Sequence, residues 1–201
     1  MFSPNTIRLS IMMFLPFFVW GGWYVSMTGY INDTGMTALT GAAYTVGPVA
    51  AIVAPFFLGM IADRFFPSEK VLGVLHLLGG VFLIIAPSVA QAFTLDSAPE
   101  DASLFYKLVL HDLPAYVQPF TLLLLLHMLC YMPTIGLTTS LSFHNLENPE
   151  KQFPLVRVAG TIGWIAGNIA VSFLPDKDES SIQFYMAGGV AILLGLYSFT
   201  L

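Results

Sequence analysis

The sequence predicts an all-α integral membrane protein with six transmembrane helices. Of its 201 residues, 56% are hydrophobic and only 9% are charged, whereas a soluble domain carries about 25% charged residues. The apolar residues gather in runs of about 20, the length that an α-helix needs to cross the hydrocarbon core of a bilayer. Short polar or proline-containing segments separate these runs. In water such a chain would expose far too much apolar surface, so we expect it to lie in a lipid bilayer.

Each apolar run defines one predicted span. The first follows a short polar lead, Met1–Asn5, and continues past signal-peptide length, so we expect it to be retained. Its aromatic residues Trp20 and Tyr24 lie on a bulky face for which packing is the common role. The fifth span is predicted to begin at Pro154, because a proline at the first helical position loses no hydrogen bond. The six predicted spans cover residues 6–30, 39–62, 71–93, 117–143, 154–174 and 181–201.

Basic residues are distributed unevenly between the two sides of this topology. The side of the N-terminus carries Arg8, Arg64, Lys70, Lys151 and Arg157. The opposite side carries only Lys107 and Lys177. Because lysine and arginine favour cytoplasmic loops, we expect a cytoplasmic N-terminus, with the loop from Asp63 to Lys70 on the same side. The longest loop, residues 94–116, is then extracytoplasmic, and its residues 104–110 can form a short helix on the membrane surface.

The fifth span carries two distinct faces. At about 100° per residue, one face combines a cation, a hydroxyl, an indole and an amide, from Arg157, Thr161, Trp164 and Asn168. A second face holds only small residues, Gly160, Gly163 and Gly167, and permits close contact with another helix. Arg157 is costly in an apolar span, and in the first turns of its helix the macrodipole also disfavours a cation. It either snorkels to the headgroups or faces a polar cavity, and its companions favour the cavity.

A second polar stripe with the same spacing lies on the fourth span. Its members are His127, Tyr131, Thr134 and Thr138. Hydrogen bonding between helices is the usual role of such a stripe, and contact with a ligand is the alternative. Tyr131 and Thr134 are therefore further candidates for ligand contact.

The order of the spans indicates a class of protein. Six spans group as three plus three around the longest outer loop, as in secondary transporters built from inverted three-helix repeats. Residues 59–64 (Gly-Met-Ile-Ala-Asp-Arg) resemble the loop motif Gly-x-x-x-Asp-Arg/Lys that joins spans two and three in the major facilitator superfamily. Gly59, Asp63 and Arg64 are thus candidate gating residues. Residues 65–70 depart from the motif, because they lack its usual glycine and paired basic residues.

Four blocks, in order and at matching spans, resemble the bacterial nucleoside:proton symporter family, the nucleoside permeases. These blocks are residues 20–23, 58–63, 131–137 and 153–163. The resemblance implies that residues 1–201 are the N-terminal six-helix half of a twelve-helix transporter whose C-terminal half is absent from this sequence. It also implies that nucleoside binds between the halves, with Arg157 and Thr161 in contact with it and Trp164 stacked on the base. The outer loop, residues 94–116, is longer than in the enterobacterial relatives.

The predicted function is secondary active transport of nucleosides across the bacterial cytoplasmic (inner) membrane, coupled to proton symport by alternating access. The proton gradient is the driving force, so we expect no cofactor and no metal, and nucleic acid is not an expected partner. Every acid lies at a span end or in a loop. Proton coupling is therefore expected to use carboxylates of the missing half, or else a histidine, His76 or His127.

Two other functions stay open. One is a major facilitator transporter of another small polar solute, such as a sugar. The other is a membrane interaction protein that does not transport, in which Leu and Val could replace the polar faces of spans four and five without loss. An enzyme is not expected, because no Ser/His/Asp set, metal-ligand cluster or phosphate loop occurs with workable spacing.

Overall fold

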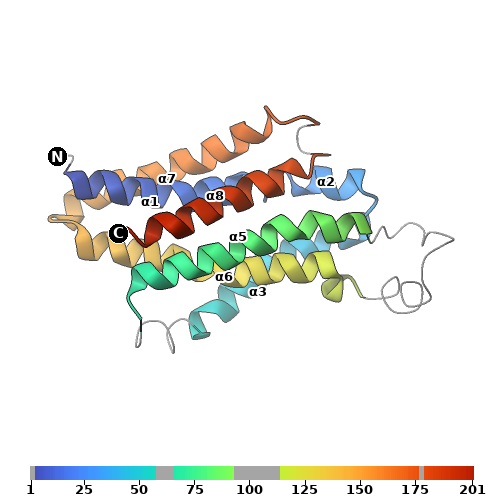
Figure 1. Ribbon diagram of the computed structural model, residues 1–201, viewed down its shortest axis with the longest axis horizontal. Coiled ribbons are helices and arrows are strands. Elements are labelled where there is room, and N and C mark those ends of the chain that lie inside the picture. The colour runs from blue at the N-terminus through green and yellow to red at the C-terminus, as the bar shows by residue number, and fades with distance from the viewer. Residues whose placement is uncertain (1–2, 58–65, 93–113, 177–178) are drawn as a thin grey trace.

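The computed structural model describes residues 3–57, 66–92, 114–176 and 179–201. Regular structure in this part of the chain is helical throughout, with two short 3-10 helices, η1 (Thr37–Leu39) and η4 (Ala115–Val117). The α-helices are α1 (Pro4–Gly21), α2 (Met27–Asp33), α3 (Thr40–Phe57), α5 (Ser68–Ala92), α6 (Pro119–Asn145), α7 (Pro149–Val171) and α8 (Ile182–Ser198) (Figure 1).

Among the described residues, four helices are long and apolar enough to cross a membrane. They comprise α3 together with η1, α5, α6 and α7, while α8 is a shorter apolar helix. These helices rise about 1.5 Å per residue, and the shortest of the four spans 20 residues, which matches the thickness of a bilayer core. The prediction of an all-α integral membrane protein is confirmed.

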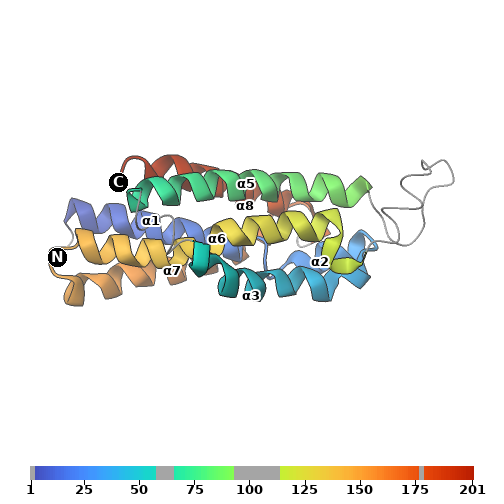
Figure 2. The ribbon, with the colours of Figure 1, turned by 90° about the horizontal axis from the view of Figure 1, so that it is seen from below.

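The long helices form one elongated bundle and run along its long axis (Figures 1 and 2). The main packing pairs are α1 with α7, α5 with α8, α5 with α6, and α3 with α6. By contrast, α1 and α7 each have little contact with α6. The chain is therefore organised as an α1–α7 pair and an α3–α6–α5–α8 series, joined mainly where α8 meets α1.

The segments predicted for the cytoplasmic side gather at one end of the bundle. Asn5 and Arg8 share a cavity of about 160 Å³ with Glu69 at the start of α5, Asn145 at the end of α6, and Leu201. The Gln152 amide at the start of α7 donates to the Thr6 hydroxyl at 3.4 Å. Both chain termini lie at this end (Figure 1). The helices thus begin and end on the sides that the sequence predicts relative to one another.

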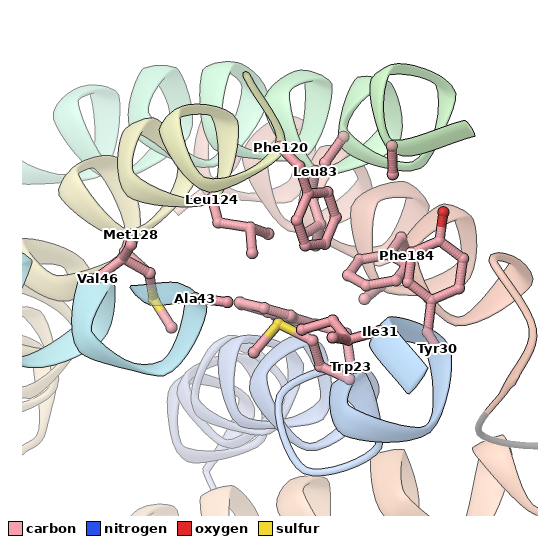
Figure 3. Packing of buried hydrophobic residues seen from close by; sticks show 14 of the residues in the cluster. Trp23, Tyr30, Ile31, Ala43, Val46, Leu83, Phe120, Leu124, Met128 and Phe184 are labelled. Atoms are coloured by element: carbon pink, nitrogen blue, oxygen red, sulfur yellow. The ribbon is translucent and has the colours of Figure 1, made fainter. Parts of the chain in front are cut away.

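Two apolar clusters hold the bundle together. The larger cluster joins α6 to α3, α5 and α8, and Figure 3 shows Phe120, Leu124 and Met128 of α6 facing Ala43 and Val46 of α3. The smaller cluster lies toward the terminal end and joins Met12 and Met13 of α1 to α5, α6, α7 and α8. Burying side chains of this size contributes about 1.5–3 kcal/mol each when the alternative is water. In a bilayer this hydrophobic contribution is smaller, and van der Waals contacts between closely packed helices stabilise the bundle instead.

Close packing is most evident between α1 and α7. A Cβ atom added at Gly163 or Gly167 would overlap the backbone carbonyl oxygen of Phe14 or Phe18, respectively. At Gly160 it would lie 2.9 Å from the Phe17 ring. The small-residue face predicted for the fifth span is therefore the face that meets α1, and the two backbones approach closely because these positions have no side chain.

The first predicted span is not one continuous helix. α1 ends at Gly21, and turns fill residues 22–26 before α2 begins at Met27. At Gly21 a Cβ would overlap the Trp164 carbonyl of α7, so the chain runs tightly against α7 at the break. Ser26, in the interrupted segment, donates a hydrogen bond from its hydroxyl to Gln183 Oε1 of α8 at 2.5 Å. Contacts with α7 and α8 thus hold the chain in place at the break.

The predicted start of the fifth span at Pro154 is wrong, because α7 begins at Pro149. The Asn148 side-chain oxygen accepts a hydrogen bond from the backbone N–H of Lys151 at 3.3 Å, and the backbone N–H of Asn148 donates to Gln152 Oε1 at 2.9 Å. This reciprocal cap satisfies donors that a helix start would otherwise leave unpaired. The cap therefore sets the helix start, and Pro154 falls inside the helix.

Candidate functional site

The polar face of α7 presents Arg157 and Thr161 on the outside of the bundle, where both side chains are exposed. Because α7 begins at Pro149, Arg157 lies in the third turn, beyond the reach of the dipole at the helix start. The predicted dipole penalty on Arg157 is therefore wrong. Its guanidinium carbon instead lies 4.5 Å from the centroid of the Phe17 ring of α1, a cation–π contact that contributes about 0.5–1 kcal/mol at an exposed position.

Trp164 lies one turn beyond Thr161 and is half-buried. Its ring meets Trp20 of α1 edge to face, with centroids 5.2 Å apart and an interplanar angle of 80°. Trp20 in turn contacts Tyr24 at 5.8 Å and Tyr131 of α6 at 5.9 Å. Tyr24 continues the aromatic series to Tyr44 of α3 at 5.2 Å. Rings from four helices or turns thus line up beside the polar face of α7.

Asn168 is half-buried against the break between α1 and α2. Its side-chain amide donates to the Trp164 backbone carbonyl at 2.9 Å, and a Cβ on Gly21 would lie 2.9 Å from the same nitrogen. Asn168 shares a helix face with Arg157, as predicted. Its amide is used to bond its own helix and to pack against the neighbouring backbone.

Tyr131 and Thr134 are buried inside the bundle. The Tyr131 hydroxyl donates to the Pro16 carbonyl of α1 at 2.8 Å, and the Thr134 hydroxyl donates to the Tyr131 carbonyl at 2.6 Å. Thr138 likewise bonds the Ile135 carbonyl at 3.0 Å. The stripe on the fourth span therefore makes hydrogen bonds within α6 and across to its neighbours. Tyr131 belongs to the aromatic series, and His127 stacks on Tyr131.

The six predicted contact residues thus divide into two groups. Arg157, Thr161 and Trp164 keep exposed or half-exposed side chains on α7. Tyr131, Thr134 and Asn168 lie behind them with their polar groups already bonded. Trp20 joins the two groups. Its place in the Trp-Gly-Gly-Trp block was the only signal in the sequence for that role, since its periodicity alone favours packing.

The predicted gating residues Gly59, Asp63 and Arg64 lie outside the described residues. Within the part of the chain that the structure describes, no group of three or more His, Cys, Asp or Glu side chains is placed to hold a metal ion. Chemically, the α7 face offers a planar fork of N–H donors, a hydroxyl and an aromatic edge. This combination can recognise a flat heterocycle that carries carbonyl oxygens.

Comparison with known proteins shows that the chain is similar to membrane transporters. The chain is 36% identical over 204 residues to the "Putative nucleoside transporter YegT" of Escherichia coli K12, an alignment that covers 98% of this chain and 42% of the relative. It is 33% identical over 201 residues to the "Xanthosine permease" of the same organism, covering 97% and 42%. The crystal structure of the nucleoside transporter NupG matches with a TM-score of 0.79 at 26% identity, over 99% of this chain and 44% of that one.

The chain therefore spans less than half the length of the relatives it matches. The family described as "Nucleoside H+ symporter" matches residues 4–98 and 103–201, almost the whole sequence. With an all-helical apolar bundle and a polar, aromatic face on α7, the chain belongs to the nucleoside H+ symporter family.

Proposed function

We propose that this chain is the N-terminal half of a nucleoside:proton symporter of the major facilitator type. The observation that carries the proposal is the face of α7, where Arg157 and Thr161 are exposed and Trp164 stands at the edge of an aromatic series. Contact of this face with lipid would be unfavourable, because an exposed arginine at membrane depth needs a polar partner. A second half, packed against this face, would supply the other wall of a binding site at the interface between repeats.

Six spans in a three-plus-three arrangement fit the observed helices. In this proposal α1 and α2 together form one interrupted span, followed by α3 and α5, and then by α6, α7 and α8. Helices interrupted near the midplane are common around transporter binding sites, and the break at residues 22–26 lies beside Trp164 and Asn168. We place the N-terminus in the cytoplasm and the protein in the bacterial inner membrane, from the distribution of basic residues.

A nucleobase fits the chemistry of the α7 face. Arg157 can donate two parallel hydrogen bonds to base carbonyl oxygens, which a lysine cannot do. Thr161, one turn away, adds a hydroxyl, and the Trp164 ring offers a surface for stacking. Tyr131, Thr134 and Asn168 act as supports, because their hydrogen bonds fix α6 and the break in the first span behind the contact residues.

We also propose, from the sequence motif, that Asp63 with Gly59 and Arg64 forms the inner gate of the transporter. The carboxylate would accept hydrogen bonds from a helix N-terminus or pair with a basic residue of the second half. Transport of another polar solute, such as a sugar, and a role without transport are the competing functions. A sugar lacks the flat heterocycle with carbonyl oxygens that the planar fork of Arg157 can recognise, and a role without transport needs no such recognition.

The test is uptake by the complete transporter, meaning this chain followed by a C-terminal half of the length found in its relatives. Reconstituted in vesicles with an inward proton gradient, it should accumulate radiolabelled nucleoside and not sugar. The isolated chain, residues 1–201, should accumulate neither, because half of the interface is missing. Accumulation of sugar but not nucleoside would reassign the substrate, and no accumulation of any solute would favour the interaction role.

A further inference from the structure

Two histidines lie deep in the bundle and take no part in the face described above. His76 of α5 and His127 of α6 are 2% and 1% exposed. Among the described residues, the Nε2 atoms of both rings have no hydrogen-bond partner. Leaving a buried polar atom unpaired costs about 1–3 kcal/mol. Two such atoms on facing helices indicate a site that is completed by something that binds there.

The tautomer of His127 follows from its one hydrogen bond. Nδ1 lies 2.8 Å from the backbone carbonyl oxygen of Gly79, and a carbonyl can only accept. Nδ1 therefore carries the hydrogen, and in the neutral ring Nε2 is left with an unshared electron pair. Binding a proton at Nε2 makes one N–H bond and breaks none, since the hydrogen bond to Gly79 persists in the imidazolium.

Aromatic rings surround the His127 side chain and favour a cation there. The ring of Tyr131 stacks on it with centroids 5.8 Å apart and an interplanar angle of 24°, and Trp23 meets it at 5.3 Å. Both distances lie within the range of about 6 Å over which a cation is attracted to an aromatic ring. The His76 ring meets the Tyr131 ring edge to face, with centroids 5.9 Å apart.

No carboxylate is found near the pair in the described residues. Tyr131 of α6 contacts both rings, Cys130 of α6 lies with His127 beside Gly79, and Tyr24, in the turn after α1, contacts Trp23. Phe184 of α8 packs against Trp23. The described acids all lie at helix ends or in loops. Away from the helix ends, the two histidines are thus the described side chains of the membrane-spanning helices that become cationic by gaining one proton.

We infer, on the basis of the nucleoside:proton symport proposed above, that His76 and His127 form a buried site that binds one coupled proton in the N-terminal half of the transporter. The pair holds one proton, because a second imidazolium beside the first would be repelled. The proton comes from the aqueous cavity on the side of uptake and is returned to water on the other side, so no other bond is made or broken.

The aromatic series links this site to the substrate. Tyr131 contacts both histidine rings and Trp20, and Trp20 contacts Trp164. In this proposal, a nucleoside stacked on Trp164 and a proton on the pair each favour the same arrangement of these rings. Nucleoside and proton then favour each other's binding by the same factor, which is the requirement for symport.

The experiment uses the complete transporter with His127→Asn or His76→Gln. The asparagine Nδ2 can replace His127 Nδ1 as donor to Gly79, and glutamine retains a polar atom at the Nε2 position of His76, but neither amide titrates. Two variants of α6 are the matched controls. Thr121→Val removes a buried hydroxyl that, like the two histidine Nε2 atoms, has no hydrogen-bond partner among the described residues. His144→Asn removes an exposed histidine from the same helix.

Three measurements are made in vesicles: nucleoside counterflow, which needs no gradient; nucleoside accumulation driven by a pH gradient; and proton uptake on adding nucleoside. We expect both histidine variants to retain counterflow within about twofold and to lose proton uptake and gradient-driven accumulation, while both controls keep all three. In the parent, nucleoside affinity should fall as the pH rises, because the pair loses its proton, and in the variants it should not change.

Proton uptake at the parent level in both histidine variants would overturn the inference and assign the proton to another group, such as a carboxylate of the second half. Loss of counterflow together with proton uptake, in variants that still insert and purify normally, would also overturn it, because the histidines would then be structural. Failure of the parent itself to exchange nucleoside would instead refute the proposed function.

Discussion

The guanidinium of Arg157 on α7 lies over the ring of Phe17 on α1, with its central carbon 4.5 Å from the ring centroid. Within the described part of the chain it makes no hydrogen bond or ion pair, so its five N–H donors are available to a partner. The contact exists because the glycine face of α7 brings the two helix backbones together at this level. Close packing of α1 and α7 thus fixes the cation while leaving its donors free.

Replacement of Arg157 by lysine or alanine in the complete transporter should weaken nucleoside binding by about ten- to a hundredfold. Loss of a charge-assisted hydrogen bond costs about 1.5–3 kcal/mol, and lysine cannot restore the planar fork. Equilibrium binding to purified protein is the measurement. Arg8→Lys is the control, because Arg8 bonds the Thr200 carbonyl at the terminal end of the bundle. If Arg157→Lys binds within about twofold of the parent, Arg157 is only an anchor.

Trp164→Ala should weaken nucleoside binding by about 1–3 kcal/mol, the range found when a ring that stacks on a base is truncated. Trp164→Phe should retain most of the affinity, since a phenyl ring keeps the surface for stacking. Binding titrations on the two variants provide the comparison. Equal affinity of the alanine and phenylalanine variants would show that the ring packs against Trp20 without touching the base.

The helices, their relative sides and the two faces of α7 follow from the sequence, because hydrophobic periodicity defines angles around a helix axis. Periodicity does not say which neighbour covers a face. Tyr131 and Thr134 hold the same places in their stripe as Thr161 and Trp164 hold on α7, yet they are buried behind α1 and bonded to it or to α6. The cap at Asn148 and the break after Gly21 depend on contacts with individual atoms of other residues. Such contacts leave little trace in composition or spacing.

Tyr131→Phe should leave nucleoside binding within about twofold of the parent and lower the stability of the purified transporter by about 1 kcal/mol. The substitution removes the buried hydrogen bond to Pro16, and such a bond contributes about 0.5–1.5 kcal/mol. Thermal unfolding in detergent, measured beside binding, separates the two effects. A loss of more than tenfold in affinity would place the Tyr131 hydroxyl in contact with substrate, the alternative that the sequence left open.

Asp63→Asn in the complete transporter should slow transport more than it weakens nucleoside binding. Asp63 lies outside the described residues. The expectation rests on the resemblance of residues 59–64 to the major facilitator loop motif and on our proposal that the carboxylate holds the inner gate closed. Uptake rates and binding affinities measured on the same preparation show whether transport or binding is affected more. An unchanged uptake rate would leave Asp63 with a purely structural role.

Packing between α1 and α7 should tolerate no added side chain at its closest points. Gly163→Ala and Gly167→Ala each place a methyl group on a backbone carbonyl of α1, and backbone cannot move aside as a flexible side chain can. Overpacking of this kind costs about 1–3 kcal/mol, although alanine favours a helix by about 1 kcal/mol over glycine. We therefore expect a net loss of thermal stability for both variants.

Gly189→Ala in α8 is the matched control, because nothing lies within 4 Å of a Cβ at that position. There only the gain in helix propensity remains, so this variant should be as stable as the parent or slightly more stable. Thermal unfolding of the three variants in one detergent makes the comparison. If Gly163→Ala matched Gly189→Ala in stability, the α1–α7 contact would have to be looser than described. The support of Arg157 by Phe17 would then lose its structural basis.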